Sequence, residues 1–308
     1  MKIFWKSWSR FEAEFELNRL KEDKVPLENT WVNGHEVFNP SSDDVLFTTN
    51  GMNYQLCPCK RVTWYAESIN YLNGEYKNYS ANRWSHRFHF VPQFATQANS
   101  SLLNIMCWWK REKKDFKKQP KFTFGMVLGR KPENPTSPTD FGYFRSKVVQ
   151  ACRNRSFYYY GTAWPAGDPH YKGEKYINGQ RHSPQKFNDA RLLLKDAKFA
   201  WCLENCHDKV YSVNYLTEKI FHGFLSGCVP VYCGCWNVQD LIGPDLFIDV
   251  RKFNYDASAV ADFCEKMSDS DYKGYQERIA KFLNEEADKF SCDYRFMELD
   301  KWFSENYA

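Results

Sequence analysis

Hydrophobic positions change their period within the stretch YLTEKIFHGFLSGCVPVYCG, residues 215–234. Apolar side chains recur at helical spacing over 220–225, with Thr217 as the predicted N-cap and Gly227 as the predicted stop. The alternation that follows predicts a strand over 229–232. A helix that begins beside a lysine can hold an anion at its N-terminus, although many such helices only pack on a sheet.

The same patterns predict strands that alternate with helices or long loops along the rest of the chain. Strands are predicted at 2–5, 43–49, 60–68, 87–94, 121–129, 157–164 and 198–205, and helices at 11–20, from about 143, and within 183–197. This alternation is typical of parallel α/β domains.

The lysine-rich stretch KREKKDFKKQPK, residues 110–121, is the best candidate for a connection between two domains. A chain of 308 residues is long enough for two domains of about 150 residues each. We therefore expect an N-terminal α/β domain over 1–118 and a C-terminal α/β domain over 119–285. A last helical segment over 286–308 is expected to pack back on the first domain.

Composition narrows the class of protein. Hydrophobic residues make up 43% of the chain and aromatic residues 18%, which excludes general disorder. A net charge of +4 argues against a uniformly basic nucleic-acid-binding surface and permits a local anion site. We expect no nucleic-acid partner.

Apolar runs and cysteines bear on the compartment. No stretch approaches the ~20 apolar residues of a membrane span, and the start MKIFWKSWSRFEAEF lacks the apolar core of a signal peptide. Eleven cysteines, in apolar contexts such as 201–203, suit reduced core thiols. These features predict a soluble, cytoplasmic chain without stable membrane insertion.

The sequence gives only weak signals of a metal site. Cys57 and Cys59 are separated by one residue, which is wrong for a zinc knuckle, and no second pair lies at matching spacing. His86 and His89 lie in an alternating segment that does not direct both rings to one ligand geometry. We expect no bound metal.

The end of one predicted strand and the start of the next helix are expected to face one crevice. Glu204 and Asn205 end the strand over 198–205, and Thr217, Glu218 and Lys219 begin the helix. Open α/β sheets bind ligands beyond the carboxyl ends of their strands.

These residues carry a family resemblance. The stretch KFAWCLENCHDKVYSVNYLTEKIFHGFLSGCVPVYCG resembles the donor-binding motif of the α1,3/4-fucosyltransferases, with its strand, Glu-Asn, Thr-Glu-Lys, helix, Val-Pro-Val and glycine. GYFRSKVVQACRNRSFYYYG is similar to the family's arginine-bearing helix and the strand after it. KRVTWYAES and ANRWSHRFHFVPQF resemble segments of its first domain, so that the resemblance runs from about residue 43 to about residue 255.

The resemblance implies an inverting glycosyltransferase of α/β GT-B type, with two Rossmann-like domains facing a central cleft. The C-terminal domain would hold a nucleotide sugar, and the acceptor would be a glycan. Arg145, Lys219 and the helix start at Thr217 would then stabilise the departing diphosphate.

The resemblance also implies roles for residues that do not bind phosphate. Glu218 would hold sugar or ribose hydroxyls, while Asn205 and Tyr215, beside Glu204, would shape the donor pocket. Glu67, after the first-domain strand, would take the proton from the acceptor hydroxyl. No cofactor other than the donor substrate is expected.

Departures from the family pattern leave the donor and acceptor open. The loop CHDKVYSVN is longer than usual, Asn214 stands where aspartate is common, and Ile69 replaces a proline. GDP-fucose is the preferred donor and a UDP-xylose-type donor is the alternative. A non-catalytic carbohydrate- or polyanion-binding protein is the alternative of another class.

One Asp-X-Asp triplet, Asp269-Ser270-Asp271, could in principle hold a metal. It follows FCEKMS and precedes an amphipathic stretch, which favours a helix N-cap with acids in the first turn. Together with the cations assigned to the diphosphate, this predicts metal-independent transfer.

Overall fold

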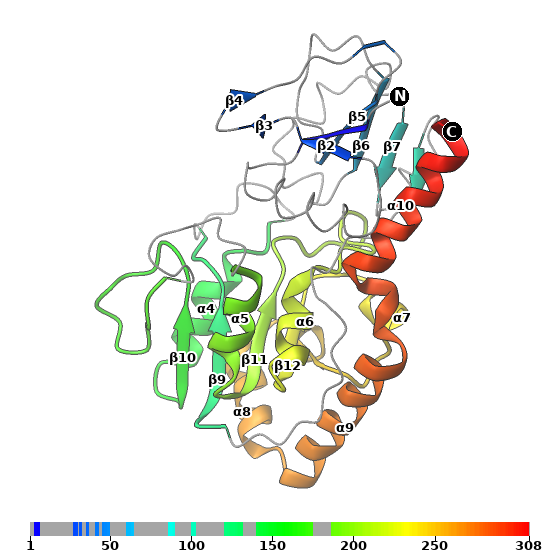
Figure 1. The fold of residues 1–308 in the computed structure, drawn as a ribbon. Helices are drawn as coiled ribbons and strands as arrows, with labels where there is room; N and C mark the ends of the chain where they lie inside the picture. Colours follow the sequence, from blue (N-terminus) through cyan, green and yellow to red (C-terminus); the bar gives the residue numbers. More distant parts are fainter. Residues whose placement is uncertain are drawn as a thin grey trace.

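The protein is described by a computed structural model. It describes residues 3–6, 27–29, 31–32, 35–36, 41–42, 45–49, 60–64, 86–89, 100–102, 120–131, 140–174 and 186–307. Two parallel sheets from successive halves of the chain lie one above the other (Figure 1).

The first sheet has the strand order β2-β1-β5-β6-β7-β8, and all its pairings are parallel. Its strands are β1 (Ile3–Lys6), β2 (Leu27–Asn29), β5 (Val45–Thr49), β6 (Lys60–Trp64), β7 (His86–His89) and β8 (Ser100–Leu102). A separate antiparallel pair joins β3 (Trp31–Val32) to β4 (His35–Glu36). Val45 and Val62 are fully buried, as β-branched residues of a covered parallel sheet should be.

The second sheet has the order β10-β9-β11-β12-β13, again with every pairing parallel. Its strands are β9 (Phe122–Val127), β10 (Phe157–Tyr160), β11 (Ala197–Leu203), β12 (Val229–Cys233) and β13 (Ile248–Asp249). The chain adds β10 on one side of β9 and β11 on the other, so the topological switch point lies between β9 and β11.

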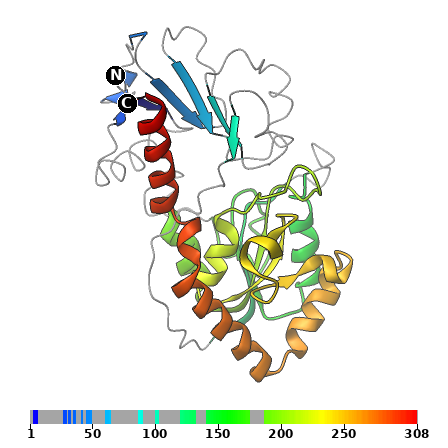
Figure 2. The ribbon, with the colours of Figure 1, turned by 90° about the vertical axis from the view of Figure 1, so that its right-hand side faces the viewer.

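Helices surround this second sheet and continue beyond it. They are α4 (Phe144–Ala151), α5 (Lys186–Leu194), α6 (Glu218–Leu225), α7 (Val238–Ile242), α8 (Ala257–Lys266), α9 (Asp269–Glu285) and α10 (Cys292–Tyr307), with short 3-10 helices η3 (Val250–Phe253) and η4 (Ala287–Phe290). In both views α10 rises from the second sheet's domain to the level of the first sheet (Figures 1 and 2). The predicted boundary near residue 118 lies outside the described residues.

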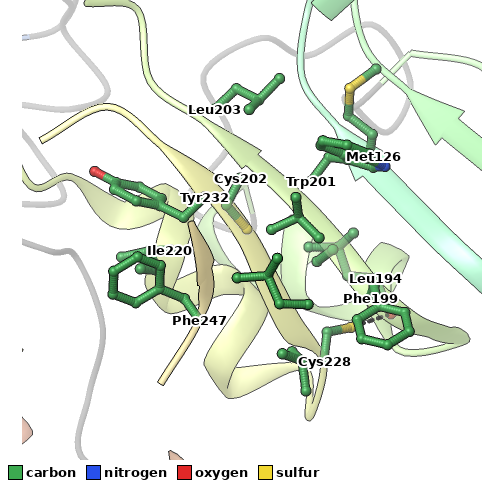
Figure 3. Packing of buried hydrophobic residues seen from close by; sticks show 14 of the residues in the cluster. Met126, Leu194, Phe199, Trp201, Cys202, Leu203, Ile220, Cys228, Tyr232 and Phe247 are labelled. Atoms are coloured by element: carbon green, nitrogen blue, oxygen red, sulfur yellow. Dashed lines mark hydrogen bonds between the residues drawn. The ribbon is translucent and has the colours of Figure 1, made fainter. Parts of the chain in front are cut away.

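The core of the second domain is built on the central strand β11. Its sequence AKFAWCL is apolar almost throughout because helices cover both faces of the sheet. Trp201 and Phe199 are buried and lie against Phe124 of β9, with ring centroids 6.2 and 5.9 Å away. Figure 3 shows Trp201 near Met126 within this packing.

The predicted change of period at residues 215–234 is confirmed. Thr217 is extended and its side chain accepts from the Lys219 N–H, which starts α6, and Gly227 has φ +72° just after the helix. Pro230 fits in β12 because β13 pairs only from Val231 onward, so the missing N–H of Pro230 interrupts no bond with that strand.

Most other predicted elements of the described residues are found, and some strands of the second sheet end earlier than predicted. The strand predicted over 198–205 ends at Leu203, and that over 157–164 ends at Tyr160, where Gly161 takes φ +150°. The helix predicted over 11–20, Glu67 and nearly all of 110–121 lie outside the described residues.

The Asp-X-Asp triplet begins α9, as predicted, but the cap itself is different. Ser268 is the N-cap, its Oγ accepts from the Asp271 N–H at 3.1 Å, and it lies 2.6 Å from the Asp271 carboxylate. Asp269 and Asp271 occupy the first turn, where the helix dipole favours acids. Serine outcompetes aspartate here because its hydroxyl can accept from one group and donate to the other.

Within the part of the chain that the structure describes, no helix is both long and apolar enough to span a bilayer.

Candidate active site

A cavity of about 120 Å³ lies at the switch point of the second sheet, beyond the carboxyl ends of β9 and β11. It is lined by Val127, Leu128, Gly129, Arg145, Gly161, Thr162, Asn205, Glu218, Lys219 and His222. These residues come from the ends of three neighbouring strands and from α4 and α6. The cavity therefore lies where an open α/β sheet of this order is expected to bind its ligand.

Gly161 lies at the rim of the cavity, where the ends of β9 and β10 come close together. A Cβ on Gly161 would lie 2.2 Å from the Leu128 carbonyl oxygen, so no other residue fits beside that strand end. Backbone hydrogen bonds from Leu128 to Tyr160 and from Arg130 to Thr162 hold the two loops together. Close approach of the two backbones thus shapes this wall of the cavity.

Arg145 is a buried cation at the cavity, with 3% of its surface exposed. Its Nη1 donates to the Gly129 carbonyl at 2.9 Å, and its Nη2 donates to the Leu203 carbonyl and to Asn205 Oδ1 at 3.2 and 2.8 Å. These acceptors join the ends of β9 and β11. These hydrogen bonds to neutral oxygens hold the planar guanidinium in a fixed position at the cavity.

Glu204 lies behind the cavity with a fully buried side chain. Thr217 donates to it from both its N–H and its hydroxyl, at 3.1 and 2.6 Å, and Lys219 Nζ lies 3.0 Å from Oε2. Burial raises the pKa of the Glu204 carboxyl above its ordinary value, while Lys219 opposes that shift. The N-terminus of α6 is therefore anchored on a buried carboxylate.

Lys219 lies between two carboxylates, with 13% of its side chain exposed. Its Nζ is 3.0 Å from Glu204 and 3.4 Å from Glu218 Oε1, and 3.1 Å from the Thr217 hydroxyl. Glu218 and Lys219 both line the cavity, so this network presents one acid and one cation to a ligand.

The predicted site residues thus divide into two groups. Arg145, Asn205, Glu218 and Lys219 meet at the cavity. The other three predicted residues of this domain, Glu204, Thr217 and Tyr215, are buried and are not among the lining residues. Their predicted roles in donor binding stay predictions, as does that of Glu67, which lies outside the described residues.

Sequence reasoning missed His222, Thr162 and the glycine rim. His222 follows Glu218 by four residues on α6, which puts both side chains on one face of the helix, and that spacing was the available signal. Thr162 follows the Tyr-Gly that ends β10, but nothing local to it indicates a cavity.

A second cluster fills the neighbouring edge, after β12 and β13. His207 Nδ1 bonds to the Gly234 carbonyl and its Nε2 to the Tyr255 hydroxyl, both at 2.8 Å, and its ring packs on Trp236 with centroids 5.4 Å apart. Burial lowers the pKa of His207, which favours the neutral ring. Arg251 binds Asp249 at 2.7 Å beside this cluster.

Within the described ranges, no three His, Cys, Asp or Glu side chains gather as they would around a metal ion. The Asp-X-Asp triplet lies at the other end of the sheet from the cavity, because Asp269 is 3.5 Å from Lys198 near the start of β11.

Comparison with known proteins agrees with this geometry. Residues 170–291 match the model of glycosyltransferase family 10 (fucosyltransferase), C-terminal part. Over 67 residues the chain is 36% identical to the alpha-(1,4)-fucosyltransferase of Arabidopsis thaliana. That match covers 22% of this chain and 16% of the plant protein, so it spans a small part of that relative.

Solved structures of known proteins share this fold. An alpha1,3-fucosyltransferase solved with GDP aligns with a TM-score of 0.61 at 16% identity, covering 100% of this chain and 89% of that one. The same kind of enzyme solved with GDP-fucose gives 0.54 at 17%, covering 90% and 81%. A DNA-modifying beta-glucosyltransferase gives 0.56 at 12%, covering 100% and 99%. The chain thus has the GT-B fold, and its residues 170–291 are similar to the C-terminal part of the family 10 glycosyltransferases.

Proposed function

We propose that this chain is an inverting glycosyltransferase that moves L-fucose from GDP-fucose to a hydroxyl of a glycan acceptor. The observation that carries the proposal is the pair of cations, Arg145 and Lys219, at the switch-point cavity. The solved fucosyltransferases of the same fold were crystallised with GDP and GDP-fucose, which supports this choice of donor.

The transfer reaction requires stabilisation of the negative charge on the leaving diphosphate and removal of a proton from the acceptor hydroxyl. As the sugar leaves, negative charge grows on the departing diphosphate, and cations already positioned there stabilise it at no cost of reorganisation. Arg145 suits this task because Gly129, Leu203 and Asn205 hold its guanidinium in place. Lys219 adds a second positive charge to the lining of the cavity, at the start of α6.

The acceptor hydroxyl must lose its proton as it attacks. We assign this step to Glu67, which follows β6 in the first domain and is expected to act from the other side of the cleft. Glu218, which lines the cavity with 27% of its side chain exposed, is assigned to hydroxyl groups of the donor. No metal is assigned to the reaction.

The direct test is release of GDP from GDP-fucose, with and without candidate glycan acceptors, beside thermal stabilisation by GDP and UDP. Saturation at ~100 times the dissociation constant should add about 2.7 kcal/mol of apparent stability. Stronger stabilisation by UDP would replace fucose with another sugar, such as xylose from UDP-xylose. Absence of nucleotide release from every sugar nucleotide would instead indicate a non-catalytic binding protein.

Glu67→Gln tests the assigned base. It should lower transfer by ~10² to 10⁴ while GDP affinity stays unchanged, because the base acts on the acceptor. GDP affinity, measured by calorimetry, is the internal control. Retention of more than about a tenth of the wild-type rate would remove Glu67 from this role.

A further inference from the structure

His222 is a titratable residue at the cavity that the proposed reaction does not yet use. It lies on α6 one turn beyond Glu218, lines the cavity with Arg145 and Lys219, and is 7% exposed. The Ser226 N–H and hydroxyl both donate to its carbonyl, at 3.1 and 2.5 Å, which fixes the backbone that carries the ring.

The charged side chains around the cavity have no net positive charge with which to balance a bound dianion. Arg145 and Lys219 contribute two positive charges, and Glu218 together with Glu204, which binds Lys219, contributes two negative charges when both are ionised. These four groups then sum to zero. A terminal phosphate alone carries about −1.5 to −2 at pH 7, so binding a nucleoside diphosphate leaves an enclosed excess of negative charge. Enclosed charge without a partner is costly, and uptake of a proton removes that cost.

Several titratable groups on the elements packed against α6 cannot take up this proton. Cys202 on β11 and Tyr232 on β12 already hold their protons, because burial raises the pKa of each well above its ordinary value. Arg191 on α5 is permanently charged. Among the described groups on or near α6, this leaves Glu204, Glu218 and His222.

Chemistry and position separate these three candidates. Glu218 lines the cavity, but its carboxylate lies 3.4 Å from Lys219, and a carboxyl ordinarily gives up its proton well below neutral pH. Glu204 lies behind the cavity, where Thr217, Lys219 and Tyr232 all bind its carboxylate. His222 lies on the cavity wall itself. Histidine is also the side chain whose charge ordinarily changes near neutral pH.

We propose that His222 is a donor-binding residue, and that it takes up one proton from solvent when a nucleoside diphosphate binds and pairs with the phosphate as an imidazolium. This inference rests on the proposed function, since it places the donor diphosphate in the switch-point cavity. Affinity for the diphosphate should then strengthen as pH falls, by up to about tenfold per pH unit for one linked proton. Below the point at which His222 is already charged without ligand, the dependence should level off.

The test is calorimetric titration with GDP at pH 7 to 8 in two buffers of different ionisation enthalpy, which counts the protons bound. The phosphate of GDP also titrates, so the decisive quantity is the difference between wild type and His222→Gln, expected to be about one proton. His170→Gln is the matched control, since both ring nitrogens of His170 are held by the Phe157 and Arg153 carbonyls. It should behave as wild type.

His222→Arg is a second variant that keeps the inference testable if His222→Gln folds poorly. A permanent cation should bind GDP at pH 8 at least as tightly as wild type, without proton uptake. Equal proton uptake in wild type and His222→Gln, or loss of uptake only in Glu204→Gln, would overturn the assignment to His222 while leaving the proposed function standing. Failure of both GDP and UDP to bind would overturn the proposed function and this inference together.

Discussion

Two arginines at the same edge of the second sheet have opposite surroundings. Arg145, at the ends of β9 and β11, donates to two carbonyls and one amide oxygen. Arg251, after β13, binds the buried carboxylate of Asp249 through Nε and Nη2 at 2.7 to 3.0 Å. The hydrogen bond to Asp249 is the largest cause that raises the pKa of Arg251.

The spaces around the two arginines differ in the same way. The edge at Arg145 is hollow, whereas the edge at Arg251 is filled by Trp236, His207 and Tyr255. The guanidinium of Arg145 lines a space that an anion can enter, whereas that of Arg251 is bonded to a carboxylate in a filled region. The difference indicates that an arginine beside an open cavity, rather than any arginine at a strand end, marks the candidate anion site.

The largest expected effect breaks this contrast directly. Arg145→Ala should weaken GDP binding and lower turnover by ~10², corresponding to about 3 kcal/mol of lost electrostatic stabilisation. Arg251→Ala should leave GDP affinity unchanged and lower the melting temperature instead, because Asp249 is then buried without its cation. Calorimetry and thermal unfolding on both variants measure this, and equal loss of GDP affinity in the two would contradict it. Arg145→Lys keeps a charge in place if the alanine variant unfolds.

Lys219 sharpens the contrast because its charge serves both stability and binding. Lys219→Ala should lower stability, since Glu204 loses a buried cation, and should weaken GDP binding as well. Adding Glu204→Gln should recover most of the stability, because no buried carboxylate then remains unpaired, but should not recover GDP affinity. A double-mutant cycle with unfolding and binding measured separately tests this. Joint recovery of both quantities would mean that Lys219 acts only through Glu204.

Glu204 also predicts how stability depends on pH. Burial raises its pKa from the ordinary value of 4.5, so its contribution is fully present below that value and is lost as pH rises through the folded-state pKa. The wild type should therefore lose stability above pH 4.5, at no more than about 1.4 kcal/mol per pH unit, relative to Glu204→Gln. Urea unfolding of both proteins across this range gives the difference. A difference that is constant with pH would show that Glu204 titrates normally.

The smallest effects are expected at the opposite end of the sheet. Ser268→Ala should cost about 1 kcal/mol of stability through the lost cap of α9, with transfer unchanged. Asp269→Ala combined with Asp271→Ala should cost less than that and should likewise leave transfer unchanged. Transfer should persist in excess chelator. If chelator abolished transfer, manganese restored it, and the double substitution blocked that rescue, the assignment of the donor site would be wrong.

Local signals predicted the fold and part of the site. The residues that cap α6, form its apolar face and end it lie close together in the sequence. Arg145 and Asn205 lie at the ends of elements that meet at one edge of the sheet. The direction of Glu204 could not be predicted in this way. The Glu204 side chain fits beneath α6 because Gly234, directly after β12, leaves room for it: a Cβ there would lie 2.1 Å from Glu204 Cγ.

His222 was missed for a related reason. The helical pattern places it beside apolar residues, and only the packing of α6 against β11 and β12 decides which part of the helix surface meets the cavity. Local sequence patterns predict helix caps and strand ends. They do not predict the position of a side chain that is set by packing against a neighbouring strand.

The buried cysteines of the second domain can report when that domain opens. Seven cysteines between Cys152 and Cys264 are buried, and burial raises the pKa of the Cys152 thiol to about 12. Because the thiolate is the reactive species, an alkylating reagent at neutral pH should label these positions only when the domain opens. Peptide mass spectrometry of the labelled protein would then report, site by site, whether a bound nucleotide closes the whole domain or only the strands beside the cavity.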